Sequence, residues 1–208
     1  MDAHSATHTS TSPQRTPDMF NTASHGKVGM WMFLGTDALT FSGFLIGYGV
    51  LRARNPQWPD PAHYLGIGLS AFATFILICS SVTMVIAQAA GEVKDSKKML
   101  RYLLFTILGG IIFLSIQAYE YTHLMHHTGM IFSDFKSGPP QFASTFYVIT
   151  GFHGFHVFSG VVYLCIMAVR TWLGKYDNGN VNHVEICGLF WHFVDLVWIL
   201  VFTFIYLI

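Results

Sequence analysis

Long apolar segments alternate with short polar ones along this chain. A helix that spans a bilayer needs about 20 predominantly apolar residues. Five segments meet that requirement, namely Lys27–Leu51, Tyr64–Ala90, Met99–Tyr121, Phe142–Val169 and Val184–Ile208. The four breaks between them contain prolines, glycines or clustered charges, which are typical of turns and loops. The pattern therefore predicts an all-α, polytopic membrane protein, a bundle of five transmembrane helices.

Composition supports this prediction. Hydrophobic residues make up 52% of the chain and charged residues only 11%, with a mean hydropathy of +0.47. Soluble domains carry about 25% charged residues. The formal net charge is zero, which gives no indication of a nucleic-acid partner. The three cysteines lie within or beside apolar segments without metal-ligand spacing, so we interpret them as small buried hydrophobic residues.

The two ends of the chain differ in character. Residues 1–25 are rich in Ser, Thr, His and Pro and lack the basic-then-apolar order of a signal peptide. We expect them to form a polar, flexible N-terminal tail. Residues 26–208 hold all five apolar segments and are predicted to be one membrane domain.

Basic residues predict the orientation, because cytoplasmic loops are enriched in Lys and Arg. Eight of them flank the side of the bundle that holds the N-terminus: Arg15, Lys27, Lys94, Lys97, Lys98, Arg101, Arg170 and Lys175. Three flank the other side: Arg52, Arg54 and Lys136. We therefore expect the N-terminus in the cytoplasm and the C-terminus outside.

Ionisable residues inside the apolar segments are the candidate functional groups, since a charge at mid-membrane costs roughly 2.5–3.5 kcal/mol on insertion scales. They are Asp37 in the first segment, Glu120 at the outer end of the third, His153 and His156 in the fourth, and Glu185, His192 and Asp195 in the fifth. At about 100° per residue they form stripes with nearby glycines and aromatic residues. The stripes are Asp37 with Thr40, Phe44 and Gly47; His153 and His156 with Gly160 and Tyr163; and Glu185, Gly188, His192 and Asp195 flanked by Trp191 and Trp198.

Two interpretations of these stripes stay open. Buried His–carboxylate pairs can serve only to hold helices together, or they can take part in proton chemistry. For Asp37, whose neighbours in sequence offer only the hydroxyls of Thr36 and Thr40, the alternatives are a proton-related role and a neutral, hydrogen-bonded carboxyl. A glycine in each stripe is expected to allow close approach, and Gly43 and Gly47 form a small-xxx-small pair.

Histidine spacing raises the question of a metal site. "HLMHH" (His123 to His127) and the pair His153 and His156 resemble parts of di-iron histidine boxes, although the remaining boxes are missing. A bis-histidine haem between His156 and His192 is a further alternative. The preferred prediction is that this chain binds no metal or redox cofactor, because it shows no complete catalytic set of its own. That pattern favours an accessory subunit of a larger assembly.

Three stretches together resemble subunit III of the haem–copper terminal oxidases in its five-helix form. They are "IQAYEY" (Ile116–Tyr121), "GFHGFHVFSG" (Gly151–Gly160) and "WHFVDLVWILVFTFIYL" (Trp191–Leu207). "MWMFLGTDALTFSGF" looks like the family's carboxylate-bearing helix, and "SSVTMVIAQAA" fits the helix after it. The resemblance covers Gly26 to Ile208.

The resemblance implies a subunit without haem or copper, which partner subunits I and II carry. It implies roles in assembly, in phospholipid binding and in proton uptake by subunit I, the main contact, with subunit II and, where one is present, subunit IV as further partners. Asp37 matches the buried carboxylate that carbodiimides modify in longer relatives. The inner polar positions of the family fall on Glu120, His153, His156, Glu185, His192 and Asp195, with Trp191, Trp198 and Gly160 in packing roles.

The resemblance also implies that the wider complex, in a bacterial plasma membrane, reduces O2 and pumps protons during aerobic respiration. "QAYEY" and Glu185 favour cytochrome c over quinol as the electron donor. The alternatives are a quinol oxidase subunit, a related nitric oxide reductase accessory protein and, more distantly, a small proton-coupled carrier. A carrier is disfavoured because no inverted repeat is visible.

Overall fold

The computed structural model describes residues 25–130, 138–176 and 181–208. Within these ranges five helices are long and apolar enough to cross a membrane. They are α1 (His25–Arg54), α3 (Ile67–Glu92), α4 (Ser96–His123), α5 (Pro140–Trp172) and α6 (Asn182–Phe202). Short π-helical turns, η1 (Leu124–Thr128) and η2 (Thr203–Leu207), continue α4 and α6. The all-α, five-span prediction is confirmed, whereas the predicted tail lies outside the described residues except for His25.

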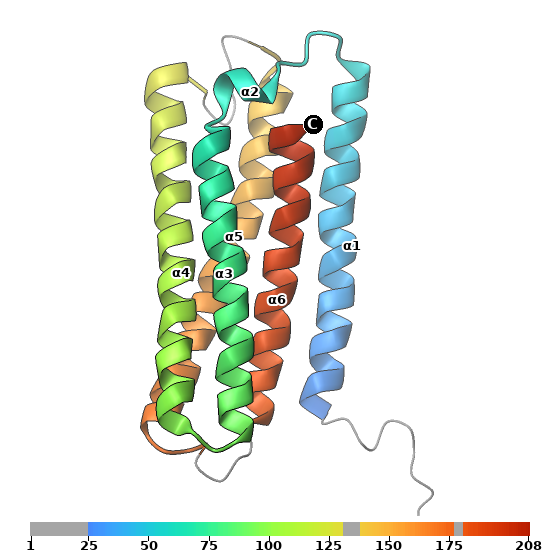
Figure 1. Ribbon diagram of the computed structural model, residues 1–208. Coiled ribbons are helices and arrows are strands. Elements are labelled where there is room, and N and C mark those ends of the chain that lie inside the picture. Colours follow the sequence, from blue (N-terminus) through green and yellow to red (C-terminus); the bar gives the residue numbers. More distant parts are fainter. Residues whose placement is uncertain (1–24, 131–137, 177–180) are drawn as a thin grey trace, which may run out of the picture.

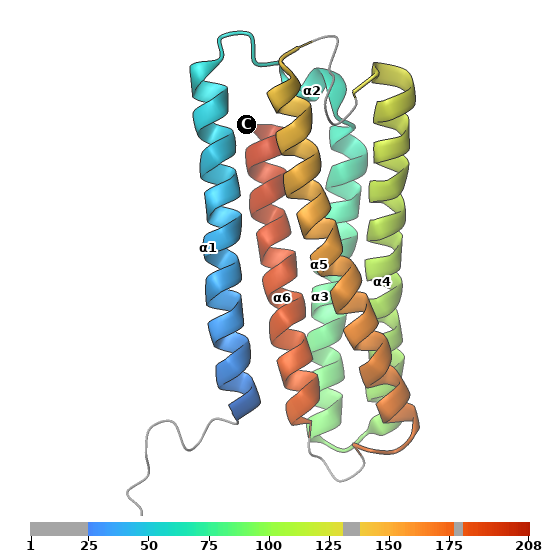
Figure 2. The same cartoon turned by 180° about the vertical axis from the view of Figure 1, so that it is seen from behind.

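Four of the spanning helices form a bundle, and the fifth stands at its edge. Neighbouring helices in the bundle pack in the order α3, α4, α5, α6 and back to α3, while α1 packs mainly against α6 and α5 (Figures 1 and 2). The connection between α3 and α4 lies at the end where α1 begins, α5 ends and α6 begins at that same end, and the C-terminus lies at the opposite end (Figure 1).

Capping residues define several helix ends. Asp60 accepts a hydrogen bond from the Ala62 backbone N–H and begins the short helix α2 (Pro61–Tyr64). Asp95 accepts one from Lys98 and begins α4, since a side-chain oxygen at this position satisfies a free N–H of the first turn. Lys94 has a φ of 61°, a left-handed conformation that lets α3 reverse directly into α4.

Most segment boundaries differ from the sequence-based expectation by a few residues. Tyr64 was expected to begin the second span, but it belongs to α2, and α3 begins after Gly66. The third span was expected to end at Tyr121, but helical structure continues through η1 to Thr128. The polar residues of "THLMHHT" therefore lie on a helical extension.

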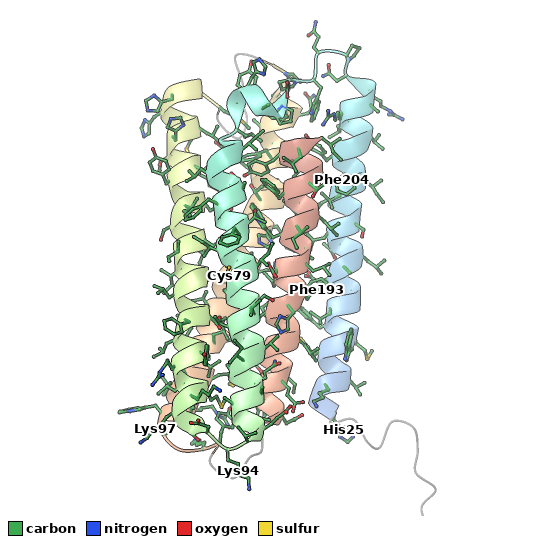
Figure 3. All side chains as sticks on the ribbon, viewed as in Figure 1. His25, Cys79, Lys94, Lys97, Phe193 and Phe204 are labelled. Carbon is green, nitrogen blue, oxygen red and sulfur yellow. The ribbon has the colours of Figure 1, made fainter. Side chains whose placement is uncertain are left out.

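Both the inside and the outside of the bundle are apolar. Leu77, Met84 and Phe113 are buried in the core, whereas Met32 and Leu39 on α1 are 71% and 74% exposed. Helices that are hydrophobic all round are typical of a membrane environment. Lys94 and Lys97 lie at the end where α1 begins, while the labelled Phe193 and Phe204 lie along the apolar length of α6 and η2 (Figure 3).

This uniform apolarity explains three corrections. On α1 the buried face holds Leu34, Asp37, Phe41 and Tyr48, whereas Thr40 and Gly47, expected on the face of Asp37, are exposed. Gly43 and Gly47 make no close approach to the part of the chain with described positions, because a Cβ added at either would have no neighbour there within 4 Å. Cys79 and Cys165 are exposed, and only Cys187 is buried. An apolar segment that faces lipid cannot be distinguished by hydropathy from one that faces a neighbouring helix.

Candidate functional site

The candidate site centres on a carboxylate–imidazole contact between α1 and α5. Asp37, near the middle of α1, is 8% exposed, and its Oδ1 lies 3.3 Å from Nε2 of His156. The Nδ1 atom of His156 lies 2.9 Å from the backbone carbonyl oxygen of Phe152. The contact supplies the partner for Asp37 that its neighbours in sequence do not, because the hydroxyls of Thr36 and Thr40 donate to backbone carbonyls of their own helix.

These distances restrict where protons can be. A carbonyl oxygen only accepts, so Nδ1 of His156 carries a hydrogen and donates it to Phe152. If neither Nε2 nor Oδ1 carried a proton, two lone pairs would face each other at 3.3 Å in an apolar interior. The contact is therefore favourable only when one proton lies between Asp37 and His156, on either atom. The second carboxyl oxygen, Oδ2, is buried and has no hydrogen-bond partner in the described part of the chain.

Aromatic rings flank His156 in this pair. The rings of Phe152 and Phe41 lie 4.7 Å and 5.5 Å, centroid to centroid, from the imidazole of His156. Asp37 and His156 are both buried, and the low dielectric of such surroundings strengthens any interaction between the two groups.

His153 lies one turn away from His156 and differs from it in its surroundings. The side chain is fully buried, and its ring lies against Trp198 and Phe113 at centroid distances of 4.8 Å and 5.8 Å. Neither ring nitrogen has a hydrogen-bond partner within the described residues. His153 therefore belongs to the aromatic core beside the Asp37–His156 contact and is not bonded to it.

Hydrogen bonds join α6 to α3 along the bundle. Nε1 of Trp191 donates to Oγ of Ser80 (3.2 Å), and Nε1 of Trp198 donates to Oγ1 of Thr74 (2.8 Å). Nδ1 of His192 lies 2.6 Å from Oγ of Ser81. His192 and Asp195 were expected to bond to each other or to partners on the first, third and fourth spans, and the structure corrects that expectation for His192. Its partner is a hydroxyl of the second span.

The remaining carboxylates lie in three different settings. Glu120 is buried and accepts hydrogen bonds from Ser70 (3.0 Å) and from the hydroxyl of Tyr206 (2.9 Å). Glu185 is part-exposed and forms an ion pair with Lys27 where α1 and α6 begin, outside the inner cluster. Asp195 is buried, and its Oδ1 has no partner in the described ranges.

Among the glycines of the predicted polar stripes, Gly160 is the one that allows the rigid indole ring of Trp191 to pack closely. A Cβ added to it would lie 2.9 Å from Cε3 of Trp191, and one added to Gly110 on α4 would lie 2.7 Å from Cη2 of the same ring. Trp191 is therefore seated between two glycines on facing helices. At Gly188 the neighbouring atom belongs to the flexible side chain of Gln88.

Sequence reasoning missed the hydroxyl residues that serve as partners: Ser70, Thr74, Ser80 and Ser81 on α3, and Tyr206 at the C-terminus. The available signal was the recurrence of hydroxyls within an otherwise apolar span. Ser and Thr side chains inside membrane helices commonly hydrogen-bond across helices.

Within the described residues, the histidines of the inner cluster do not converge on a common point for a redox metal. Both ring nitrogens of His156 face protein oxygen atoms, and Nδ1 of His192 is engaged by Ser81. Among the residues with described positions, no group of three or more His, Cys, Asp or Glu side chains is placed to hold a metal ion.

The fold and the site define a class of protein: a polytopic helical bundle that holds carboxylates and imidazoles inside the membrane. Sequence comparisons define the family. The family model described as "Cytochrome c oxidase subunit III" matches residues 18–208. The chain therefore belongs to the cytochrome c oxidase subunit III family and is subunit III of a haem–copper oxidase.

Individual relatives agree with this assignment over most of their length. The chain is 35% identical over 199 residues to "Cytochrome c oxidase subunit 3" of Corynebacterium diphtheriae, with 94% of each chain covered. It is 34% identical over 182 residues to the "Probable cytochrome c oxidase subunit 3" of Nocardia farcinica, with 87% of each covered. Identity to the Alkalihalophilus pseudofirmus protein named "Cytochrome c oxidase subunit 3" is 31% over 180 residues, covering 86% of this chain and 85% of the relative.

Proposed function

We propose that this subunit transfers no electrons itself and supports proton uptake by subunit I, its main partner. In this proposal haem and copper reside in subunits I and II, and subunit IV, where one is present, is a further neighbour. The observation that carries the proton role is the buried contact between Asp37 and His156, 3.3 Å apart. An ionisable group inside a membrane is expected to be functional by default.

The chemistry of the contact fits a proton-holding unit. One proton shared between Oδ1 and Nε2 leaves the pair without net charge whichever atom carries it, so the low-dielectric surroundings impose little penalty. When the proton moves from Oδ1 to Nε2, Asp37 becomes negatively charged and His156 positively charged, and the two charges are separated only by this short contact. Asp37 could therefore exchange a proton with a partner subunit while His156 keeps its position.

Phospholipid binding is the second part of the proposal. An apolar groove of about 390 Å³ between α1 and α6 is lined by Trp31, Leu34, Ala38, Leu189 and Phe193 among others. Its dimensions and its almost wholly apolar walls suit an acyl chain. Lys27 and Glu185 lie near the end where both helices begin, at the level expected for a head group.

The assembly is tested by purification through a tag on this chain in mild detergent. We expect haem-bearing subunits to co-purify, with a visible spectrum that identifies the haems, and we expect the complex to oxidise reduced cytochrome c in preference to quinol. Recovery of the chain without any haem protein would contradict the assembly, and preference for quinol would contradict the proposed donor.

The proton role is tested in the purified complex by Asp37→Asn. The amide keeps the size of the carboxyl and can donate to Nε2 of His156, but it cannot release a proton. We expect normal assembly, slower proton uptake and earlier loss of activity during sustained turnover. Thr40→Val, on the exposed face of α1, is the matched control. If Asp37→Asn takes up protons and lasts as long as the control, the proton role is wrong.

A further inference from the structure

Three histidines at the carboxyl end of α4 take no part in the inner network. His123, His126 and His127 are exposed and line a cavity of about 240 Å³ together with Tyr119 and Thr122. No hydrogen bond joins any of the three rings to the part of the chain that the structure describes. These rings are therefore open to a ligand on the surface of the described structure.

Two of the three rings are next to each other. The imidazoles of His123 and His127 stack with their centroids 4.5 Å apart and their planes inclined by 30°. Residues four apart lie on one face of a helix, and two histidines at this spacing are a recurring zinc-binding arrangement. A shared ion lies in the plane of each imidazole, so both rings must turn out of this stacked arrangement to place one nitrogen each about 2.0–2.1 Å from it. Exposed side chains can make this movement by rotation of χ angles.

The position on the helix also favours a cation. The pair lies at the carboxyl end of α4 and in the π-helical turn η1 that continues it. The last carbonyl groups of a helix have no partner within it and carry a partial negative charge. Their field adds to the affinity of neutral imidazoles for a divalent ion.

We propose that His123 and His127 form a two-imidazole site for a late first-row divalent transition-metal ion, Cu²⁺ or Zn²⁺, with water completing the coordination. Imidazole suits these metals, and affinity rises from Ni²⁺ to Cu²⁺ and falls again at Zn²⁺. Two protein ligands make the ion exchangeable, so this site differs from a resident redox cofactor and goes beyond the function proposed above.

The test is a Cu²⁺ titration of the purified full chain in detergent, followed by electron paramagnetic resonance, whose nitrogen couplings count the imidazoles bound. His4 and His8 in the N-terminal tail are replaced by alanine in the parent protein so that only the other histidines contribute. We expect one Cu²⁺ per chain with two imidazole nitrogens, displaced by Zn²⁺ but not by Mg²⁺, which prefers oxygen ligands.

Single substitutions assign the ligands. His123→Ala and His127→Ala should each weaken binding by about a hundredfold, because the second imidazole acts as an intramolecular contact. His126→Ala, which lines the same cavity without stacking, should change it less than threefold, roughly 0.6 kcal/mol. Parent-like affinity in His127→Ala, or an equal loss in His126→Ala, overturns the assignment. Helical circular dichroism of each variant establishes that it is folded.

Discussion

At the residue scale, the contact between Asp37 and His156 shows how a membrane interior accommodates an acid. The sequence places only two hydroxyls near Asp37, and neither of them reaches it. The partner comes from α5, and the aromatic rings of Phe41 and Phe152 flank it. A charged or polar group without such a partner would carry its full desolvation cost.

Substitution of the two residues should reveal their coupling. Asp37→Leu leaves Nε2 of His156 without a partner, and His156→Leu leaves the carboxyl without one, so each should lower the free energy of unfolding by about 1–3 kcal/mol. The double variant should lose clearly less than the sum of both. Denaturant unfolding in detergent micelles measures all four proteins. Strict additivity would show that the two side chains do not interact.

At the element scale, α6 is held to α3 by side chains and to α4 and α5 by close packing. Trp198 and Trp191 each combine a buried ring with one hydrogen bond to an α3 hydroxyl, which is the usual arrangement for a buried indole. Trp191 also occupies the space that Gly110 and Gly160 leave open.

The hydrogen bond of Trp198 should contribute measurably to stability. Thr74→Val keeps the shape of the side chain but removes the acceptor of Nε1, so we expect a loss of about 1–3 kcal/mol in unfolding free energy. Thr40→Val is the control, because the Thr40 hydroxyl is exposed and bonds only within its own helix. Equal stability of both variants would mean that the Trp198 bond contributes nothing.

The close packing of Trp191 against Gly160 is tested by adding a methyl group at position 160. Gly160→Ala places a Cβ against a rigid indole and should cost about 1–3 kcal/mol, typical of overpacking. Gly154→Ala lies on the same helix with nothing within 4 Å of the added Cβ, and it should be neutral or slightly stabilising. Thermal denaturation of the two variants in one detergent gives the comparison. The same melting temperature for both would contradict this packing.

At the scale of the whole molecule, an odd number of spans places the two ends of the membrane domain on opposite sides. Lys94 and Lys97 lie at the end where α1 begins, as Figure 3 shows, and the C-terminus lies at the other (Figure 1). Arg52 and Arg54 end α1 on the C-terminal side. The bias of basic residues predicts which of the two ends faces the cytoplasm.

Tags on the two termini test the orientation. On intact cells we expect external protease, after permeation of any outer layer, to remove a C-terminal tag and to spare an N-terminal one. Lysed cells provide the control in which both tags are cleaved. Protection of the C-terminal tag in intact cells would reverse the predicted orientation.

Sequence alone determined the number of spans, their approximate positions and the presence of polar groups within them. These features follow from chain-local physics, because about 20 apolar residues cross a bilayer wherever they occur and a charge among them is costly. Proline, glycine and charged clusters located the loops. The same local reasoning misplaced the end of the third span, since nothing in "THLMHHT" forces the helix to stop.

Only the tertiary structure decided which face of each helix is inside and which groups meet. Helices that are apolar on every side give hydropathy no means of choosing a face, so Gly47 and Thr40 were assigned inward although they are exposed. The partners of Asp37, His192 and Trp198 lie 119, 111 and 124 residues away along the chain. Such pairings depend on how the helices are rotated and stacked. Packing between the helices determines that arrangement, and the local sequence of each helix does not predict it.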